Sequence, residues 1–145
     1  TTPHHDRNRV GKATGRLIGG NLALLAHLAG TISMPDTKGC ILFIEDVGEY
    51  LYNIDRMLVQ LDRAGKLKDL AGLVVGGFTD LKDTTIPFGM QIDDIIFSHV
   101  AKYKYPVVFD FPASHSKNNV ALRIGQIHTL TVRKQGCTLT NKGNE

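Results

Sequence analysis

The most constraining feature of this sequence is a run of four apolar residues that leads directly into carboxylates. Residues 41–44 are Ile-Leu-Phe-Ile, and Glu45, Asp46 and then Glu49 follow them. An unbroken apolar run between glycines is typical of a strand that is buried on both faces of a parallel sheet. In open α/β sheets, ligands bind beyond the carboxyl ends of such strands. Glu45 and Asp46 are therefore candidate site residues, although solvated turn residues or helix caps fit the same pattern.

The segments that follow predict a βαβ unit. Residues 50–64 carry apolar side chains at three- and four-residue intervals and stop before Gly65, as an amphipathic helix does. A second apolar run lies at residues 71–78. A helix predicted at residues 92–102 precedes a third strand at residues 106–109. Alternation of strands and helices indicates an α/β fold with a parallel core.

Both ends of the chain differ in pattern from this core. Residues 120–125, 127–132 and 137–140 alternate apolar and polar side chains, which predicts half-exposed antiparallel strands. We therefore expect a mixed sheet or a small barrel. Residues 1–16 are polar and lack periodicity, so they are interpreted as a linker or arm that precedes one domain at residues 17–145.

The composition argues against several classes of function. With 42% hydrophobic and 21% charged residues, the chain has the composition of a soluble globular protein. A net charge of +3 from scattered basic residues gives little support for nucleic-acid binding. Membrane spans need about 20 apolar residues, and no run approaches this length. The cysteines form no Cys-x-x-Cys motif, and the His4–His5 pair has no third ligand at useful spacing, so we expect a solvated pair and no metal.

A short helix is predicted at residues 22–29. Asn21 is a favoured N-cap, and Gly30 is a favoured residue just beyond a helix. The preceding Gly19 and Gly20 fit a capping geometry. They could also let a substrate carboxylate reach the free backbone N–H groups. Their spacing matches neither a dinucleotide fingerprint nor a P-loop, so both alternatives stay open.

A second candidate site residue, His115, follows the third predicted strand. We expect that strand to neighbour the first, which would bring His115 near Glu45. A carboxylate beside an imidazole fixes its tautomer and stabilises the imidazolium, as an acyl-transfer base requires. However, none of the four serines lies in a Gly-x-Ser-x-Gly elbow, so a nucleophile is missing. Residue spacing alone leaves open both a catalytic pair and a structural ion pair.

Taken together, several segments resemble the C-terminal domain of the LD-carboxypeptidases, the serine peptidases of family S66, which also includes the microcin C immunity peptidases. The resemblance extends from about Gly15 to Gly125. It rests on Gly19–Leu22, Gly30–Thr31, Ile41–Asp46 with Glu49, Ile54–Leu58, Leu61, Gly65, Gly76–Phe78, and Pro112–His115 with Asn119 and Leu122. It implies the swivelling β/β/α architecture, in agreement with the mixed sheet expected above.

The resemblance also implies an activity. Glu45 and His115 would belong to a Ser-Glu-His triad whose serine lies in an N-terminal nucleophile domain of the same polypeptide. That domain is absent from this chain, which begins with Thr1, so we expect the chain alone to be inactive. The family hydrolyses the bond between an L-configured centre and a terminal D-amino acid, as in the murein tetrapeptide during cell-wall recycling in the cytoplasm. The resemblance implies a homodimer and no cofactor.

Within this interpretation, Asp46 and Glu49 are expected to support the pair, and Gly20 and Asn21 are candidate substrate contacts. Family members commonly carry glycine where this chain has Ser114. If that position needs a positive φ, serine would cost about 1 kcal/mol and reposition the imidazole. Two alternatives remain: a microcin C immunity-type peptidase that cleaves an aminoacyl-nucleotide conjugate, and a non-catalytic docking or dimerisation module.

Overall fold

A mixed six-stranded sheet forms the frame of the domain. The computed structural model describes residues 2, 4–115 and 117–141. The elements are β1 (Gly11–Asn21), α1 (Leu22–Leu28), β2 (Ile41–Val47), α2 (Leu51–Arg63), β3 (Gly72–Thr79), α3 (Ile92–Val100), β4 (Val107–Val108), β5 (Ile127–Arg133) and β6 (Gly136–Asn141). Their order in the sheet is β4-β3-β2-β1-β5-β6. Strands β1 to β4 pair in parallel and β5 and β6 pair antiparallel, which confirms the predicted α/β fold with a βαβ core.

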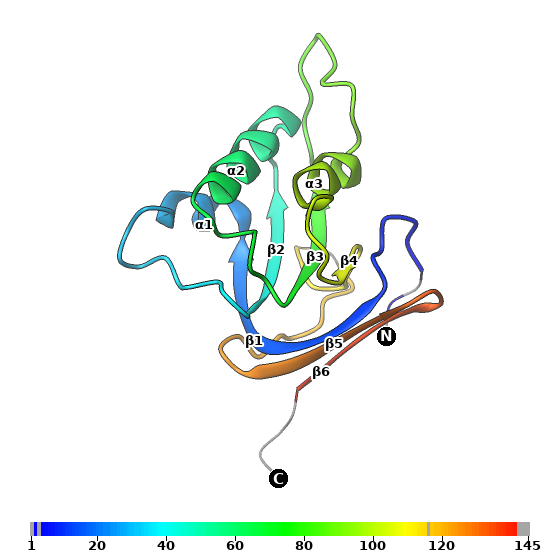
Figure 1. The fold of residues 1–145 in the computed structure, drawn as a ribbon. Helices are drawn as coiled ribbons and strands as arrows, with labels where there is room; N and C mark the ends of the chain where they lie inside the picture. Colours follow the sequence, from blue (N-terminus) through cyan, green and yellow to red (C-terminus); the bar gives the residue numbers. More distant parts are fainter. Residues whose placement is uncertain (1, 3, 116, 142–145) are drawn as a thin grey trace.

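The long strand β1 joins the two parts of the sheet, as the bent blue ribbon in Figure 1 shows. Its second half, residues 17–21, pairs in parallel with β2. Its first half, residues 11–16, pairs antiparallel with β5. The interpretation of residues 1–16 as a linker or arm is therefore wrong for residues 11–16, and the sequence analysis missed β1 as a strand.

The two faces of the sheet are covered by different parts of the chain. The three helices cover one face (Figure 1), where Ile44 and Val75 belong to one buried cluster with Leu58 of α2 and Ile95 of α3. The opposite face carries a second cluster, which includes Phe111 and Ala113 from the segment after β4 and Leu130 from β5. Because successive side chains of a strand point to opposite faces, each central strand serves both clusters.

The helix predictions are confirmed to within two residues at each end, and one predicted strand is wrong. Asn21 caps α1, since its side chain accepts a hydrogen bond from the Leu24 N–H at 3.1 Å. Gly30 follows with a φ of 87°. Residues 120–125, by contrast, form no strand. Over the described residues, no helix is long and apolar enough to cross a membrane.

Candidate active site

Glu45 and Asp46 lie on opposite faces of the sheet. Phe43 belongs to the cluster on the face away from the helices and Ile44 to the cluster under them, so the pleat directs Glu45 away from the helices and Asp46 toward them. The pairing of β2 with β3 shifts register at this point: Ile44 lies opposite Val75, but Asp46 lies opposite Phe78. Glu45 therefore lies within β2 opposite a β-bulge, in which β3 carries one extra residue, a feature that often re-aims a side chain beside a site.

His115 contacts Glu45 directly. The distance from His115 Nδ1 to Glu45 Oε2 is 2.8 Å. A carboxylate accepts, so Nδ1 carries the proton in this contact, and Nε2 of the neutral ring is left as the acceptor. The Glu45 side chain is 10% exposed, whereas that of His115 is 55% exposed. The carboxylate is thus held within the fold while the imidazole reaches the surface.

The loop after β4 brings His115 to this position by crossing the end of β3. The expectation that the first and third predicted strands are neighbours is wrong, because β3 lies between β2 and β4. The Phe111 N–H donates to the Val75 carbonyl at 3.0 Å, and the Gly77 N–H donates to the Ala113 carbonyl at 3.4 Å. A Cβ at Gly76 would lie only 2.2 Å from the Ala113 oxygen, so glycine permits the loop to lie against β3.

A pocket of about 250 Å³ adjoins the pair. Besides Glu45 and His115, it is lined by Gly19 and Gly20, by the polar residues Ser114 and Asn119, and by apolar residues, namely Phe43, Ala113, Val120, Leu122 and Ile124. None of these apolar residues was predicted as a site residue. The alternation of apolar and polar side chains at residues 120–125 could have indicated them. Such alternation gives a segment one apolar side, whether or not the segment pairs as a strand.

Residues 14–130 match the family of LD-carboxypeptidase C-terminal domains. The chain belongs to this family. Over 115 residues it is 38% identical to a protein of Bacillus subtilis named probable murein peptide carboxypeptidase, covering 79% of this chain and 36% of that protein. Over 120 residues it is 32% identical to the murein tetrapeptide carboxypeptidase of Pseudomonas aeruginosa, covering 82% of this chain and 38% of that protein. The chain thus spans well under half the length of these curated relatives.

Solved structures share the fold of this LD-carboxypeptidase domain. The muramoyltetrapeptide carboxypeptidase of Oxalobacter formigenes superposes with a TM-score of 0.85 at 36% identity, over 94% of this chain and 47% of that one. The microcin C7 self-immunity protein MccF superposes with a TM-score of 0.80 at 23% identity, over 94% of this chain and 40% of that one. The second likeness shows a common fold and nothing about substrate.

Ser114 does not occupy a left-handed conformation in this LD-carboxypeptidase domain. Among the described residues other than glycine, a positive φ occurs at Asp80 and Asp110. The energetic cost considered for serine at this position therefore does not arise. The Ser114 N–H donates to Asn119 Oδ1 at 3.2 Å, which closes a turn around His115. Ser116, on the other side of the histidine, lies outside the described residues.

Asp46 and Asn21 hold the start of α1 and do not line the pocket. Asp46 is 2% exposed, and its carboxylate accepts from Asn21 Nδ2 at 2.8 Å and from the Ala23 N–H at 3.0 Å. It also accepts from the Val47 N–H at 2.8 Å. A carboxylate is favoured at a helix N-terminus because the free N–H groups carry partial positive charge. Asp46 thus links the end of β2 to α1 and supports Glu45 only through the backbone.

Glu49 lies in a separate groove between α1 and α2, with Ala23, His27 and Arg56. Its carboxylate accepts from Asn53 Nδ2 at 2.7 Å, one helical turn along. The structure therefore does not bring Glu49 to the pocket of Glu45 and His115. Over residues 2, 4–115 and 117–141, no group of three or more His, Cys, Asp or Glu side chains is arranged to hold a metal ion.

Proposed function

We propose that this domain supplies the acid and the base of a Ser-Glu-His triad that hydrolyses the L,D-peptide bond to the terminal D-amino acid of murein tetrapeptide. The observation that carries the proposal is the 2.8 Å contact between His115 Nδ1 and Glu45 Oε2. This contact orients the exposed edge of the imidazole, Nε2, as a proton acceptor. The printed names of the two curated relatives, a murein peptide and a murein tetrapeptide carboxypeptidase, support the substrate.

In the proposed mechanism, His115 acts first as general base and then as general acid. Nε2 takes the proton from a serine hydroxyl of the N-terminal nucleophile domain as that oxygen attacks the peptide carbonyl. Glu45 stays ionised, holds the tautomer through Nδ1–H, and stabilises the imidazolium. Nε2 then gives its proton to the nitrogen of the leaving D-amino acid. Water repeats the sequence to release the acyl group, so proton transfer needs no metal or organic cofactor.

The pocket beside the pair is proposed to hold the substrate. Gly20 lines it, and a Cβ at this position would meet no atom within 4 Å, so its backbone faces open space. A peptide can hydrogen-bond to such an uncovered backbone, and the apolar wall of Val120, Leu122 and Ile124 can take aliphatic groups. Asn21 is proposed to act only by fixing the backbone around Gly20, through its bonds to Asp46 and Leu24.

We also propose a cellular setting and binding partners for the domain. The likeness to murein peptidases supports action in cytoplasmic cell-wall recycling, and the family resemblance supports a homodimer. Two exposed apolar side chains near α1, Leu24 at 66% and Ile32 at 107%, fit an apolar surface for a second copy. The same resemblance supports the N-terminal nucleophile domain as the partner, with no role for nucleic acid or membrane.

The test uses the full-length polypeptide that contains this chain. We expect release of the terminal D-amino acid from an L,D-tetrapeptide and at least about a hundredfold lower kcat/KM with the L,L-isomer, since a misplaced carbonyl loses its alignment with the nucleophile. An aminoacyl-nucleotide conjugate, the substrate class expected of a microcin immunity-type enzyme, is measured in parallel. Preferential hydrolysis of the conjugate, or no hydrolysis of either substrate, would contradict the proposal.

A further inference from the structure

Residues 4–9, here called the N-terminal arm, are built into the domain at the base of the loop that carries His115. Arg9 exchanges backbone hydrogen bonds with Val107 of β4: the Arg9 N–H donates at 2.9 Å, and the Val107 N–H donates back at 3.1 Å. Asn8 Oδ1 accepts from the Phe109 N–H at 2.8 Å. The arm therefore extends the hydrogen bonding of β4 to the residue after that strand.

The same arm is tied to both ends of α3. Arg7 forms an ion pair with Asp94 in the first turn of the helix. Arg9 reaches the other end, where Nη2 donates to the Val100 carbonyl at 3.1 Å. Burial lowers the pKa of Arg9, although the guanidinium stays charged at any ordinary pH. The arm thus spans α3 from its first turn to its last.

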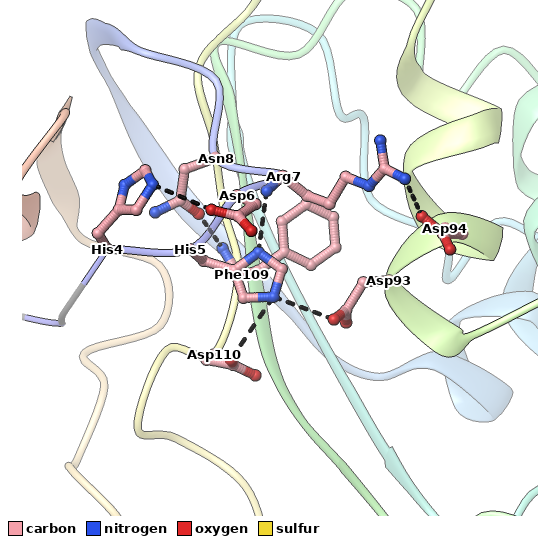
Figure 2. Close-up of polar contacts among 9 residues, drawn as sticks. All are labelled: His4, His5, Asp6, Arg7, Asn8, Asp93, Asp94, Phe109 and Asp110. Carbon is pink, nitrogen blue, oxygen red and sulfur yellow. Dashed lines mark hydrogen bonds and ion pairs between the residues drawn. The ribbon is translucent and has the colours of Figure 1, made fainter.

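His5 connects these two sets of contacts. Figure 2 shows its ring against Phe109 and its Nε2 directed toward both Asp93 and Asp110. The ring centroids of His5 and Phe109 are 5.2 Å apart, and Nε2 lies 3.0 Å from Asp93 Oδ2 and 3.7 Å from Asp110 Oδ2. The Arg7 N–H donates to Nδ1 at 3.1 Å, so Nδ1 is the acceptor of the ring and Nε2–H donates to Asp93. The prediction of a solvated pair is therefore wrong for His5, whose side chain is 18% exposed.

Asp110 is the point at which the chain leaves β4 for the His115 loop. Its φ of 53° is a left-handed conformation, which is uncommon for residues other than glycine, although aspartate and asparagine adopt it more often than most. Such a turn is kept only when its surroundings hold it. Here the surroundings include Asn8, which accepts from the N–H of Phe109, and the His5 ring, which stacks on the Phe109 ring.

We infer that His5 is a positioning residue that couples the N-terminal arm to the loop carrying His115. The arm leads directly into β1, and Thr2, which precedes the arm, exchanges backbone hydrogen bonds with Cys137 of β6. By packing against Phe109, the residue before Asp110, His5 sets the direction in which the loop crosses β3 to meet Glu45. The inference rests on the proposed function for its catalytic consequence, but the coupling itself can be measured without catalysis.

The experiment compares His5→Ala with His4→Ala, a matched control. The side chain of His4 is 52% exposed, and its carboxylate partner, Asp6, is 99% exposed. Amide hydrogen exchange of residues 110–115 is measured on the 145-residue chain, and kcat and KM are measured on the full-length enzyme. For His5→Ala we expect exchange about tenfold faster and kcat about tenfold lower with KM little changed, because one hydrogen bond to a charged group and one ring contact are lost. His4→Ala should match the wild type.

A conservative variant keeps the test decisive if His5→Ala lowers stability throughout the domain. His5→Gln retains an N–H donor that can reach Asp93, so it should restore slow exchange in the loop and most of kcat. Equal exchange in His5→Ala and His4→Ala would overturn the inference. So would faster exchange spread evenly over the domain in both His5 variants. If the full-length wild type hydrolyses no tetrapeptide, the proposed function fails, while the exchange data still decide the coupling.

Discussion

Gly77 lies directly against Ser114, the residue before the candidate catalytic histidine. A Cβ at Gly77 would lie 2.5 Å from Ser114 Oγ and 2.8 Å from Ser114 Cβ. The Gly77 N–H also donates to the Ala113 carbonyl, so β3 and the loop that carries His115 are in contact through their backbones as well. The position of His115 therefore depends on the absence of a side chain on β3.

This contact predicts that Gly77→Ala displaces the His115 loop. In the full-length enzyme we expect kcat to fall by about a hundredfold, the scale expected for a displacement of roughly 1 Å at the reacting groups. Ser114→Gly removes both clashing atoms, so the double variant Gly77→Ala/Ser114→Gly should recover most of the loss. Steady-state kinetics of the four enzymes measures this coupling. Independent, additive effects of the two substitutions would show that the contact does not set the loop.

Asp46 is expected to matter for stability more than for chemistry. Asp46→Ala leaves the donors of Asn21, Ala23 and Val47 without their carboxylate inside the fold. We expect the free energy of unfolding to fall by about 2–4 kcal/mol. Glu49→Ala, which removes one hydrogen bond from a half-buried side chain, should cost about 1 kcal/mol or less. Urea unfolding of both variants compares them, and equal losses would contradict the assignment of Asp46 as the support of α1.

The ionised Asp62 carboxylate is predicted to stabilise the fold less at acid pH than at neutral pH. Burial acts to raise the pKa of its carboxyl, but hydrogen bonds from Lys102 and Tyr103 outweigh this and bring the pKa below its ordinary value of 3.8. Because the folded pKa is the lower one, the stabilisation is present above about pH 4 and is lost as the pH falls through the folded pKa. The stability difference between the wild type and Asp62→Asn should therefore shrink from about pH 6 to about pH 3.

Unfolding by urea at several pH values measures this difference. Asp69→Asn serves as the control, since Asp69 is 51% exposed and its pair with Lys68 has a distance of 3.9 Å. Its stability difference should stay small throughout the range. A difference for Asp62→Asn that is constant, or that grows in acid, would contradict the assignment of the two hydrogen bonds as the stabilising contacts.

The isolated 145-residue chain should not hydrolyse murein tetrapeptide. In the proposed mechanism, His115 and Glu45 supply only the acid–base pair. The attacking hydroxyl and the oxyanion donors come from the N-terminal nucleophile domain, and without them most of the rate enhancement is lost. Release of D-amino acid by the purified chain, at a rate near that of the full-length protein, would contradict the need for a partner domain.

The parts of the fold that the sequence predicts are those with strong local patterns. Short segments suffice to recognise the apolar run of β2, the 3.6-residue periodicity of α2 and the cap residues of α1. Strand β1 is not, because residues 11–16 are rich in glycine and polar side chains and become a strand only by pairing with β5 more than a hundred positions later. No local pattern reports such a partner.

The candidate site was predictable in its chemistry and not in its geometry. Glu45 follows the apolar run of β2 and His115 lies in the polar loop after β4, and both positions are local signals. Their contact depends on a loop that crosses β3 over Gly76 and Gly77. This path could not be predicted, because no single segment of the sequence indicates the order of the strands in the sheet. The pleat of a strand directs Glu45 and Asp46 to opposite faces, a signal that was not used in predicting both as candidate site residues.

The central claim is that Glu45 orients His115 for proton transfer from a serine, and the most direct measurement is kcat for Glu45→Gln in the full-length enzyme. Glutamine keeps the size of the side chain but removes the charge that stabilises an imidazolium. We predict that kcat falls by at least about a thousandfold in Glu45→Gln and by as much in His115→Ala. The kcat of the double variant should be no lower than that of either single variant, because the two residues act as a unit. Glu49→Gln, the matched control, should stay within about twofold. A Glu45→Gln enzyme that keeps kcat within about tenfold of the wild type would contradict the account.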